Sequence, residues 1–315
     1  YQYFVDPHFL NTPHGISRRH IPGLATDSCG FGSTLFLVFP ICFLGFTCFG
    51  TPVKKTAAGL LAGLLIFCLV LNGSRSAFVG AVLFLMTLPG IRSWVHGRNS
   101  RSWRSHIITI FIPLIFIASL YGLFYCKSPE ASHVRLLDRM ASVLTSVSQG
   151  DFNKALGSRP AIALQGLRIF GQSPFSGVGP GGFWRNIENS FFADGKKSRY
   201  FDNAANHYLQ IGSELGVFGL VLNVFLHVLP LWLIFRVRKR IRDPGERWAV
   251  GIVFTTVCIF MILYLSGPHT MNIDVLWILV VMLSFLFVTA VRHGYRFPEF
   301  SRERYLMGSI AIFYI

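Results

Sequence analysis

Long apolar runs alternate with shorter polar segments along most of this 315-residue chain. A helix that crosses a membrane needs roughly 20 predominantly apolar residues at a rise of about 1.5 Å per residue. Seven runs approach or reach this length, near residues 32–50, 56–72, 75–91, 107–126, 209–235, 248–266 and 274–291. Because the runs lack the alternation typical of barrel strands, the pattern predicts membrane helices.

Composition indicates the same class. Apolar residues make up 52% of the chain, charged residues only 14%, and the mean hydropathy is +0.51. A soluble protein of this length would carry more polar surface. We therefore expect an all-α polytopic membrane protein with about seven transmembrane helices and a large, mostly helical outer loop. The expected divisions are 1–126, 127–206 and 207–315; a start at Tyr1 and an end within an apolar run favour a fragment of a longer protein.

Basic residues gather in alternate loops between the predicted spans. The clusters lie at residues 54–55, 92–104, 236–247 and 292–304 and contain more than half of the 29 lysines and arginines. The positive-inside rule makes these loops cytoplasmic, so the other loops face outward. The net charge of +15 then follows mostly from topology, and no nucleic-acid partner is expected. Packing is the expected role of the six cysteines, which form no CxxC motif; no metal site is expected.

The outer loop 127–206 contains ten basic and six acidic residues. Such a loop either attracts an anion or is simply a solvated face. Within it, the residues from Ser158 to Phe170 are typical of an amphipathic helix, with Ser158 as the N-cap and Arg159 at the start. The glycine- and proline-rich stretch that follows, 172–182, predicts a turn. Its backbone N–H groups could contact phosphate, or the turn could be a tight connector under a helix, which the spacing alone favours.

Three segments together carry a resemblance to a known family. They are LNGSRSAFVGA at 71–81, the stretch from Arg159 to Phe183 that ends in SPFSGVGPGGF, and NHYLQIGSELGVFGL at 206–220. A weaker echo is GLATDSCGFGSTL at 23–35. In type and order these segments resemble motifs of the O-antigen ligase and Wzy polymerase-like membrane glycosyltransferases.

The resemblance implies a GT-C-like enzyme of lipopolysaccharide or other polysaccharide biosynthesis. It would span the bacterial inner membrane with its large loop in the periplasm. Members of the family transfer a glycan from an undecaprenyl-diphosphate carrier to a lipid A core, a polysaccharide or a protein acceptor. No cofactor or metal is expected, because arginines would bind the diphosphate.

By this resemblance, Arg75 and Arg159 are the first candidates for diphosphate binding, and snorkelling or surface exposure is the alternative for each. Arg168 and Arg185 are weaker candidates. The further candidate substrate contacts are Gly177, Gly179, Asp202, Asn206 and Glu214. Glu214 lies two helical turns beyond His207, and it either pairs with Arg75 or Arg159 or snorkels to the membrane interface.

The candidate general base departs from the family pattern. Ala205 occupies the position where the family has histidine, and His207 follows two residues later. His207 is either the base or a histidine with a structural hydrogen bond, while Asp202 and His269 are possible substitutes. The departure permits a divergent or inactive family member. A transporter for an anionic solute is a separate alternative, because some relatives of the family are described in that way.

Overall fold

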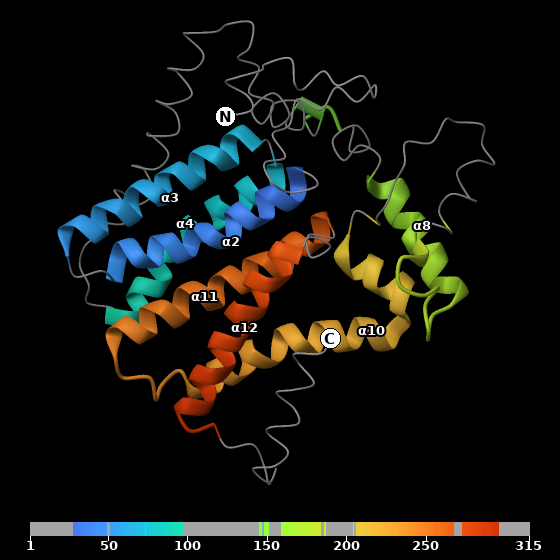
Figure 1. Cartoon of the computed structure of the whole chain (residues 1–315). Helices are drawn as coiled ribbons and strands as arrows, with labels where there is room; N and C mark the ends of the chain where they lie inside the picture. Colours follow the sequence, from blue (N-terminus) through green and yellow to red (C-terminus); the bar gives the residue numbers. More distant parts are fainter. Residues whose placement is uncertain are drawn as a thin grey trace, which may run out of the picture.

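The structure is a computed structural model that describes residues 28–48, 51–72, 74–96, 145–146, 148–150, 159–183, 186, 204, 206–267 and 273–295. The main helices in this part of the chain are α2 (Ser28–Cys48), α3 (Pro52–Asn72), α4 (Arg75–His96), α8 (Arg159–Gln172), α10 (His207–Val237), α11 (Pro244–Leu263), the short 3₁₀ helix η2 (Tyr264–Ser266) and α12 (Ile273–Arg292). Figure 1 shows α2, α3, α4, α11 and α12 as one bundle. Helix α8 lies away from this bundle and packs against α10.

The helices coincide with six of the seven predicted apolar runs; the run at 107–126 lies outside the described residues. Five of the described helices are long and apolar enough to cross a membrane. The apolar stretch of α2, Phe31–Gly45, is shorter. The polytopic helical class is therefore confirmed, while the count of seven spans stays a prediction.

Aromatic side chains from α2, α4 and α11 form the centre of the bundle. Phe39 and Phe84 meet edge to face with their ring centroids 5.7 Å apart. Phe36 and Phe260 stack at 6.4 Å. All four are at most 1% exposed. Such contacts bury large apolar surfaces and fix the three helices against one another.

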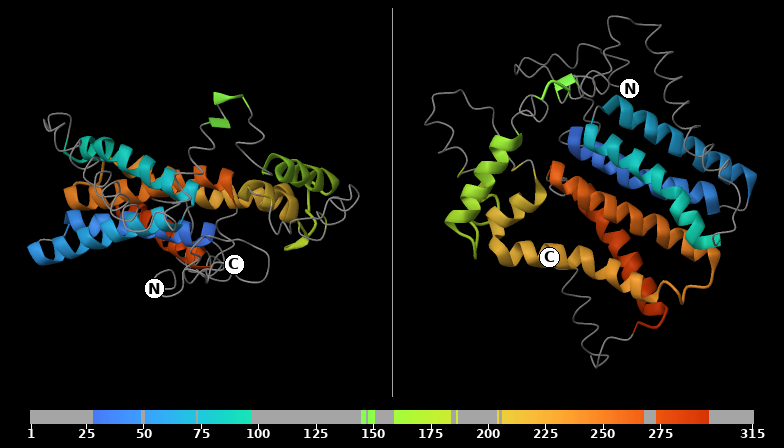
Figure 2. Two further views of the ribbon diagram at one scale, coloured as in Figure 1. Left: turned by 90° about the horizontal axis from the view of Figure 1, so that it is seen from above. Right: turned by 180° about the vertical axis from the view of Figure 1, so that it is seen from behind.

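Helix α10 is bent at Gly216, whose φ of 69° and ψ of −168° are not helical. The bend divides α10 into a short arm, residues 207–215, and a long arm, residues 217–237. The short arm carries α8, and the long arm packs against α12 (Figures 1 and 2). The apolar run 209–235 predicted one membrane helix here, without a bend.

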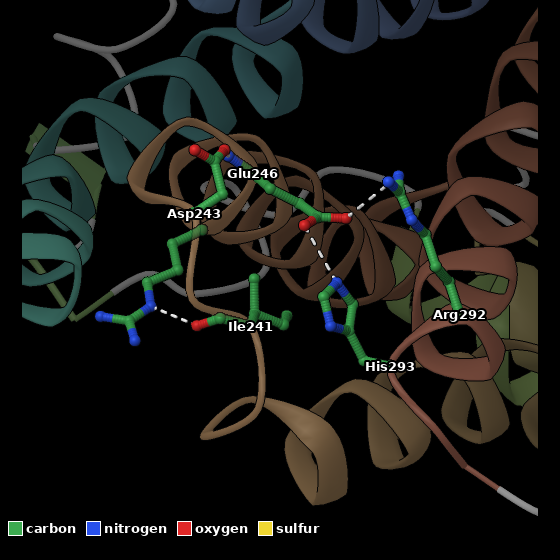
Figure 3. A network of polar contacts seen from close by, with 6 residues as sticks. Ile241, Asp243, Glu246, Arg292 and His293 are labelled. Atoms are coloured by element: carbon green, nitrogen blue, oxygen red, sulfur yellow. Dashed lines mark hydrogen bonds and ion pairs between the residues drawn. The ribbon is translucent and has the colours of Figure 1, made fainter.

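Polar contacts join α11 and α12 at the end of the bundle where α10 ends, which we call the basic end (Figure 3). Asp243 caps α11 by accepting a hydrogen bond from the Glu246 N–H at 2.6 Å. The Glu246 carboxylate lies 2.9 Å from Nε2 of His293 and 3.8 Å from a guanidinium nitrogen of Arg292. The Arg247 guanidinium donates to the Ile241 carbonyl at 2.6 Å. The two contacts of Glu246 hold the start of α11 to the end of α12.

Candidate functional site

Two of the motif-bearing segments meet where α4 begins. Gly32 of α2 lies so close to the turn before α4 that an added Cβ would be 2.6 Å from the Cβ of Ser74. Farther along α4, a Cβ on Gly80 would be 2.7 Å from a methyl carbon of Leu263. Leu263 directly precedes Tyr264, which stacks on His207. The starts of α4 and α10 and the end of α11 therefore share one end of the bundle, which we call the motif end.

Arg75 is the first residue of α4 and is half-buried. It follows a tight turn in which Asn72 and Ser74 are 1% and 5% exposed. The hydroxyl oxygens of Ser74 and Ser76 lie 3.4 Å apart on either side of it. The turn thus fixes the backbone of Arg75 at the motif end.

Helix α8 runs parallel to the short arm of α10. A Cβ on Gly166 would be 3.5 Å from the Cβ of Leu209, and one turn later Phe170 lies 3.5 Å from the Cβ position of Gly212. Arg159 begins α8 seven residues before Gly166, about 10 Å along the axis. Because His207 lies only about 3 Å before Leu209, Arg159 is roughly 7 Å beyond the start of α10, on the side of the motif end.

The two arginines of α8 lie on opposite faces. At about 100° per residue, Arg159 shares the direction of Gly166, which faces α10, whereas Arg168 is half a turn away. Arg159 is half-buried and Arg168 is exposed. Geometry therefore favours Arg159 over Arg168 as a site residue. Leu164 and Leu167 are also exposed, although both were expected on the apolar face of the predicted amphipathic helix.

Asn206 connects the start of α10 to η2. Its side-chain oxygen accepts a hydrogen bond from the Leu209 N–H at 3.1 Å, which caps the helix. Its amide nitrogen donates to the Leu265 carbonyl at 3.3 Å. The position predicted to contact substrate thus has a structural role in holding the two segments together.

Gln210 provides the hydrogen-bond partner of Glu214. Its side-chain oxygen accepts from the Ala204 N–H at 2.7 Å, and its amide nitrogen donates to Oε1 of Glu214 at 2.6 Å. Gln210 contacts one of the two carboxylate oxygens, and the expected pairing of Glu214 with Arg75 or Arg159 stays a prediction. A glutamine one turn earlier on the same helix face can satisfy the carboxylate without a long-range ion pair.

Tyr264 braces the two arms of α10. On the short arm, the ring of His207 stacks on the Tyr264 ring at a centroid distance of 4.1 Å and an angle of 28°. On the long arm, Nε2 of His227 lies 3.1 Å from the Tyr264 hydroxyl, and its Nδ1 lies 2.7 Å from the Asn223 carbonyl. Because a carbonyl oxygen only accepts, Nδ1 carries the proton and the hydroxyl donates to Nε2.

His207 is consequently buried, with 3% of its surface exposed, beneath an aromatic ring. The sequence analysis singled out His207 but missed Tyr264 and His227. Histidine within an apolar span was the available signal for His227, because a polar group in that setting needs a specific partner. Asp202, Arg185, Ala205 and His269 lie outside the described residues.

The glycine turn, residues 173–182, completes the broken helix of α10. The bend at Gly216 separates the carbonyls of Ser213 and Glu214 from their usual donors four residues later. Three backbone hydrogen bonds to the glycine turn replace the missing ones: Val178 N–H to Ser213 O at 2.9 Å, Gly179 N–H to Glu214 O at 2.9 Å and Val217 N–H to Pro174 O at 2.7 Å. A fourth, from Gly177 N–H to Ser173 O at 2.9 Å, closes the turn itself. The turn and the helix therefore satisfy each other's backbone groups.

Glycine is required where these two backbones touch. A Cβ on Gly177 would collide with the Glu214 carbonyl, and one on Gly216 would collide with the Phe175 carbonyl. Both glycines also have positive φ, at 66° and 69°. These contacts agree with the interpretation of the turn as a tight connector. The N–H groups of Gly177 and Gly179, which a phosphate-binding turn would use, donate to carbonyls of the protein itself.

A comparison with protein families matches residues 60–224 to the family described as O-Antigen ligase. This range covers more than half of the chain and includes α4, α8, the glycine turn and the bend of α10. The chain belongs to the O-antigen ligase family. A comparison with curated proteins gives no match.

Within this member of the O-antigen ligase family, the matched range contains Arg75, Arg159 and His207, while Tyr264 lies beyond it. In the fold, Tyr264 from outside the matched range therefore contacts His207 inside it. The family also establishes a membrane protein of the ligase or polymerase type.

Replacing Tyr264 by phenylalanine is expected to lower the thermal unfolding temperature in detergent by about 2–4 °C, because it removes a buried hydrogen bond of about 1 kcal/mol. Tyr208→Phe is the matched control, since the Tyr208 hydroxyl also donates to a backbone carbonyl, that of Met261 at 2.9 Å, but from a half-buried side chain. A shift for Tyr264→Phe no larger than that for Tyr208→Phe would contradict a bracing role of the hydroxyl.

Proposed function

We propose that this protein transfers a glycan from an undecaprenyl-diphosphate carrier to an acceptor hydroxyl at the motif end. We assign this end to the periplasmic side of the bacterial inner membrane, because the arginine-rich segment 236–242 lies at the opposite end of α10. Family membership supports the general class of a ligase or polymerase-type glycosyltransferase.

One observation carries the proposal: the candidates Arg75, Arg159 and His207 are the first residues of α4, α8 and α10. Figures 1 and 2 show the starts of these three helices on the side of the bundle that faces α8. Helix N-termini carry partial positive charge, which favours a bound anion. Two guanidinium groups added to three such termini suit a diphosphate.

The proposed reaction breaks the bond between the anomeric carbon of the glycan and the diphosphate oxygen. The acceptor oxygen attacks that carbon, the acceptor loses its proton, and the diphosphate departs as an anion. Arg75 and Arg159 would stabilise the departing charge, because a guanidinium stays protonated and binds phosphate through two N–H groups. We assign the acceptor proton to His207, with Asp202 as the alternative.

The test is transfer from an undecaprenyl-diphosphate-linked glycan by the protein in nanodiscs, with EDTA present. Arg75→Ala is expected to reduce the rate by about 10²–10³-fold, the usual cost of removing one donor to a developing charge. Arg92→Ala is the matched control, because Arg92 is near the other end of the same helix. It should leave the rate unchanged.

The remaining outcomes separate the alternatives. Loss of wild-type activity in EDTA, restored by a divalent cation, would overturn the metal-free mechanism. Whichever of His207→Gln and Asp202→Asn abolishes transfer while the protein stays folded identifies the base. Folded protein that transfers no glycan to lipid A core, polysaccharide or protein acceptors would favour an inactive member or a transporter.

A further inference from the structure

The glycine turn exposes an aromatic side chain next to the membrane-spanning part of α10. Phe175 is 68% exposed, and its ring lies 6.4 Å from that of Phe218, which is 72% exposed. Between Arg168 and Arg185 the chain contains no charged residue. We propose that the glycine turn is inserted into the bilayer leaflet at the motif end, with Phe175 among the lipid acyl chains.

The first argument is continuity with the lipid-facing surface of α10. Phe218, Leu222, Phe225 and Trp232 follow one another at helical spacing on the long arm. Their exposed fractions are 72%, 49%, 53% and 42%. Large apolar side chains exposed along a spanning helix face lipid. Phe175 extends this stripe beyond the bend, so its exposed ring shares the same surroundings.

The second argument comes from the backbone of the turn. Irregular backbone enters a hydrocarbon region only where its polar groups are satisfied within the protein. The N–H groups of Ser173, Gly177, Val178 and Gly179 all donate to backbone carbonyls at 2.9–3.2 Å. Pro174 and Pro180 have no N–H group to satisfy. These bonds lower the cost of placing this part of the turn in the leaflet, whereas a turn in water could leave the same N–H groups to the solvent.

The position of Phe175 relative to the long arm also predicts how deep the glycine turn lies in the leaflet. Interfacial apolar groups are typically buried about 5–10 Å into the boundary between headgroups and acyl chains. Phe175 lies just past the end of the spanning stripe, whereas Leu222 lies about 9 Å along the long arm from Gly216 at 1.5 Å per residue. The turn should therefore contact the carboxyl ends of the acyl chains, and Leu222 their deeper parts.

The experiment places a genetically encoded, environment-sensitive fluorescent amino acid at position 175 of the full chain in phosphatidylcholine nanodiscs. The lipids are brominated either near the carboxyl end or near the methyl end of the acyl chains, and iodide serves as the aqueous quencher. Position 222 is the control for deep lipid exposure. Position 148 is the aqueous control, because Ser148 is a polar, exposed residue away from the spans.

At position 175 we expect fluorescence to be quenched by bromine, more strongly near the carboxyl end, and to be protected from iodide. Quenching by iodide to the extent seen at position 148 would overturn the proposal, because the turn would then be in water. Protection from both quenchers would also overturn it, since another protein segment would then cover Phe175. Neither outcome depends on glycan transfer, so the result is independent of the proposed reaction.

Discussion

Replacing Gly216 by alanine is expected to prevent most of the protein from reaching its folded state. A residue with a Cβ at φ 69° costs about 1–2 kcal/mol in backbone strain. The Cβ would also collide with the Phe175 carbonyl, and it would lie 2.8 Å from the Ser176 nitrogen. To relieve this clash, the glycine turn must move away from α10, and this movement breaks the hydrogen bonds between the turn and the helix. Fluorescence-detected size-exclusion chromatography and thermal unfolding in detergent would measure the loss.

Two other glycines serve as graded controls for Gly216→Ala. Gly171 in α8 has open space around its Cβ position, so alanine there should be neutral or stabilise the helix by about 0.5–1 kcal/mol. Gly179 also has open space but a φ of 89°, so alanine there should cost only the backbone strain. Gly171→Ala is expected to be the most stable of the three variants, Gly179→Ala less stable and Gly216→Ala the least stable. An unfolding temperature for Gly216→Ala equal to that for Gly179→Ala would show that close packing against the turn is unimportant.

The second large effect concerns the two arginines of α8. Arg159→Ala is expected to lower glycan transfer by about 10²–10³-fold, because it removes a fixed positive charge beside the proposed diphosphate site. Arg168→Ala removes the same charge from the exposed face of the same helix and should change the rate little. The measurement is kcat and KM for the diphosphate-linked donor at saturating acceptor.

The comparison of these variants separates local binding from general electrostatics. If Arg159 acts only by adding positive charge to the surrounding loop, both substitutions should weaken transfer equally, and both effects should vanish at high salt. If Arg159 contacts the diphosphate, Arg159→Lys should restore part of the rate, because lysine keeps the charge but loses the bidentate geometry. Full activity in Arg159→Ala would remove this residue from the site.

Local sequence signals predicted much of the fold. The apolar runs located the described helices to within a few residues at most ends, because a span must satisfy its own backbone and so depends little on distant contacts. The start of α8 was predicted at Arg159, after the expected N-cap Ser158, and the structure confirms that the helix begins at Arg159. Arg75 likewise begins α4, where its run was expected to begin.

The bend in α10 and the brace at Tyr264 could not be predicted in this way. Gly216 lies in an apolar segment that reads as continuous helix, and what breaks the helix is a turn some 40 residues earlier in the chain. Tyr264 contacts His207 and His227 only because the bend brings both arms of α10 to it. The hydrogen bond from Gln210 to Glu214 was also not predicted, because nothing in the sequence distinguishes it from a pairing with a distant arginine.

The bend also determines how α10 fits the thickness of the membrane. Straight, its 31 residues would measure about 46 Å, well beyond a hydrocarbon core of about 30 Å. The long arm, residues 217–237, measures about 31 Å and matches that core without tilt. Hydrophobic mismatch is thus relieved at Gly216, and the short arm is free to run along the bilayer surface. A long arm of this length would place Gly216, and with it the glycine turn, at one edge of such a core.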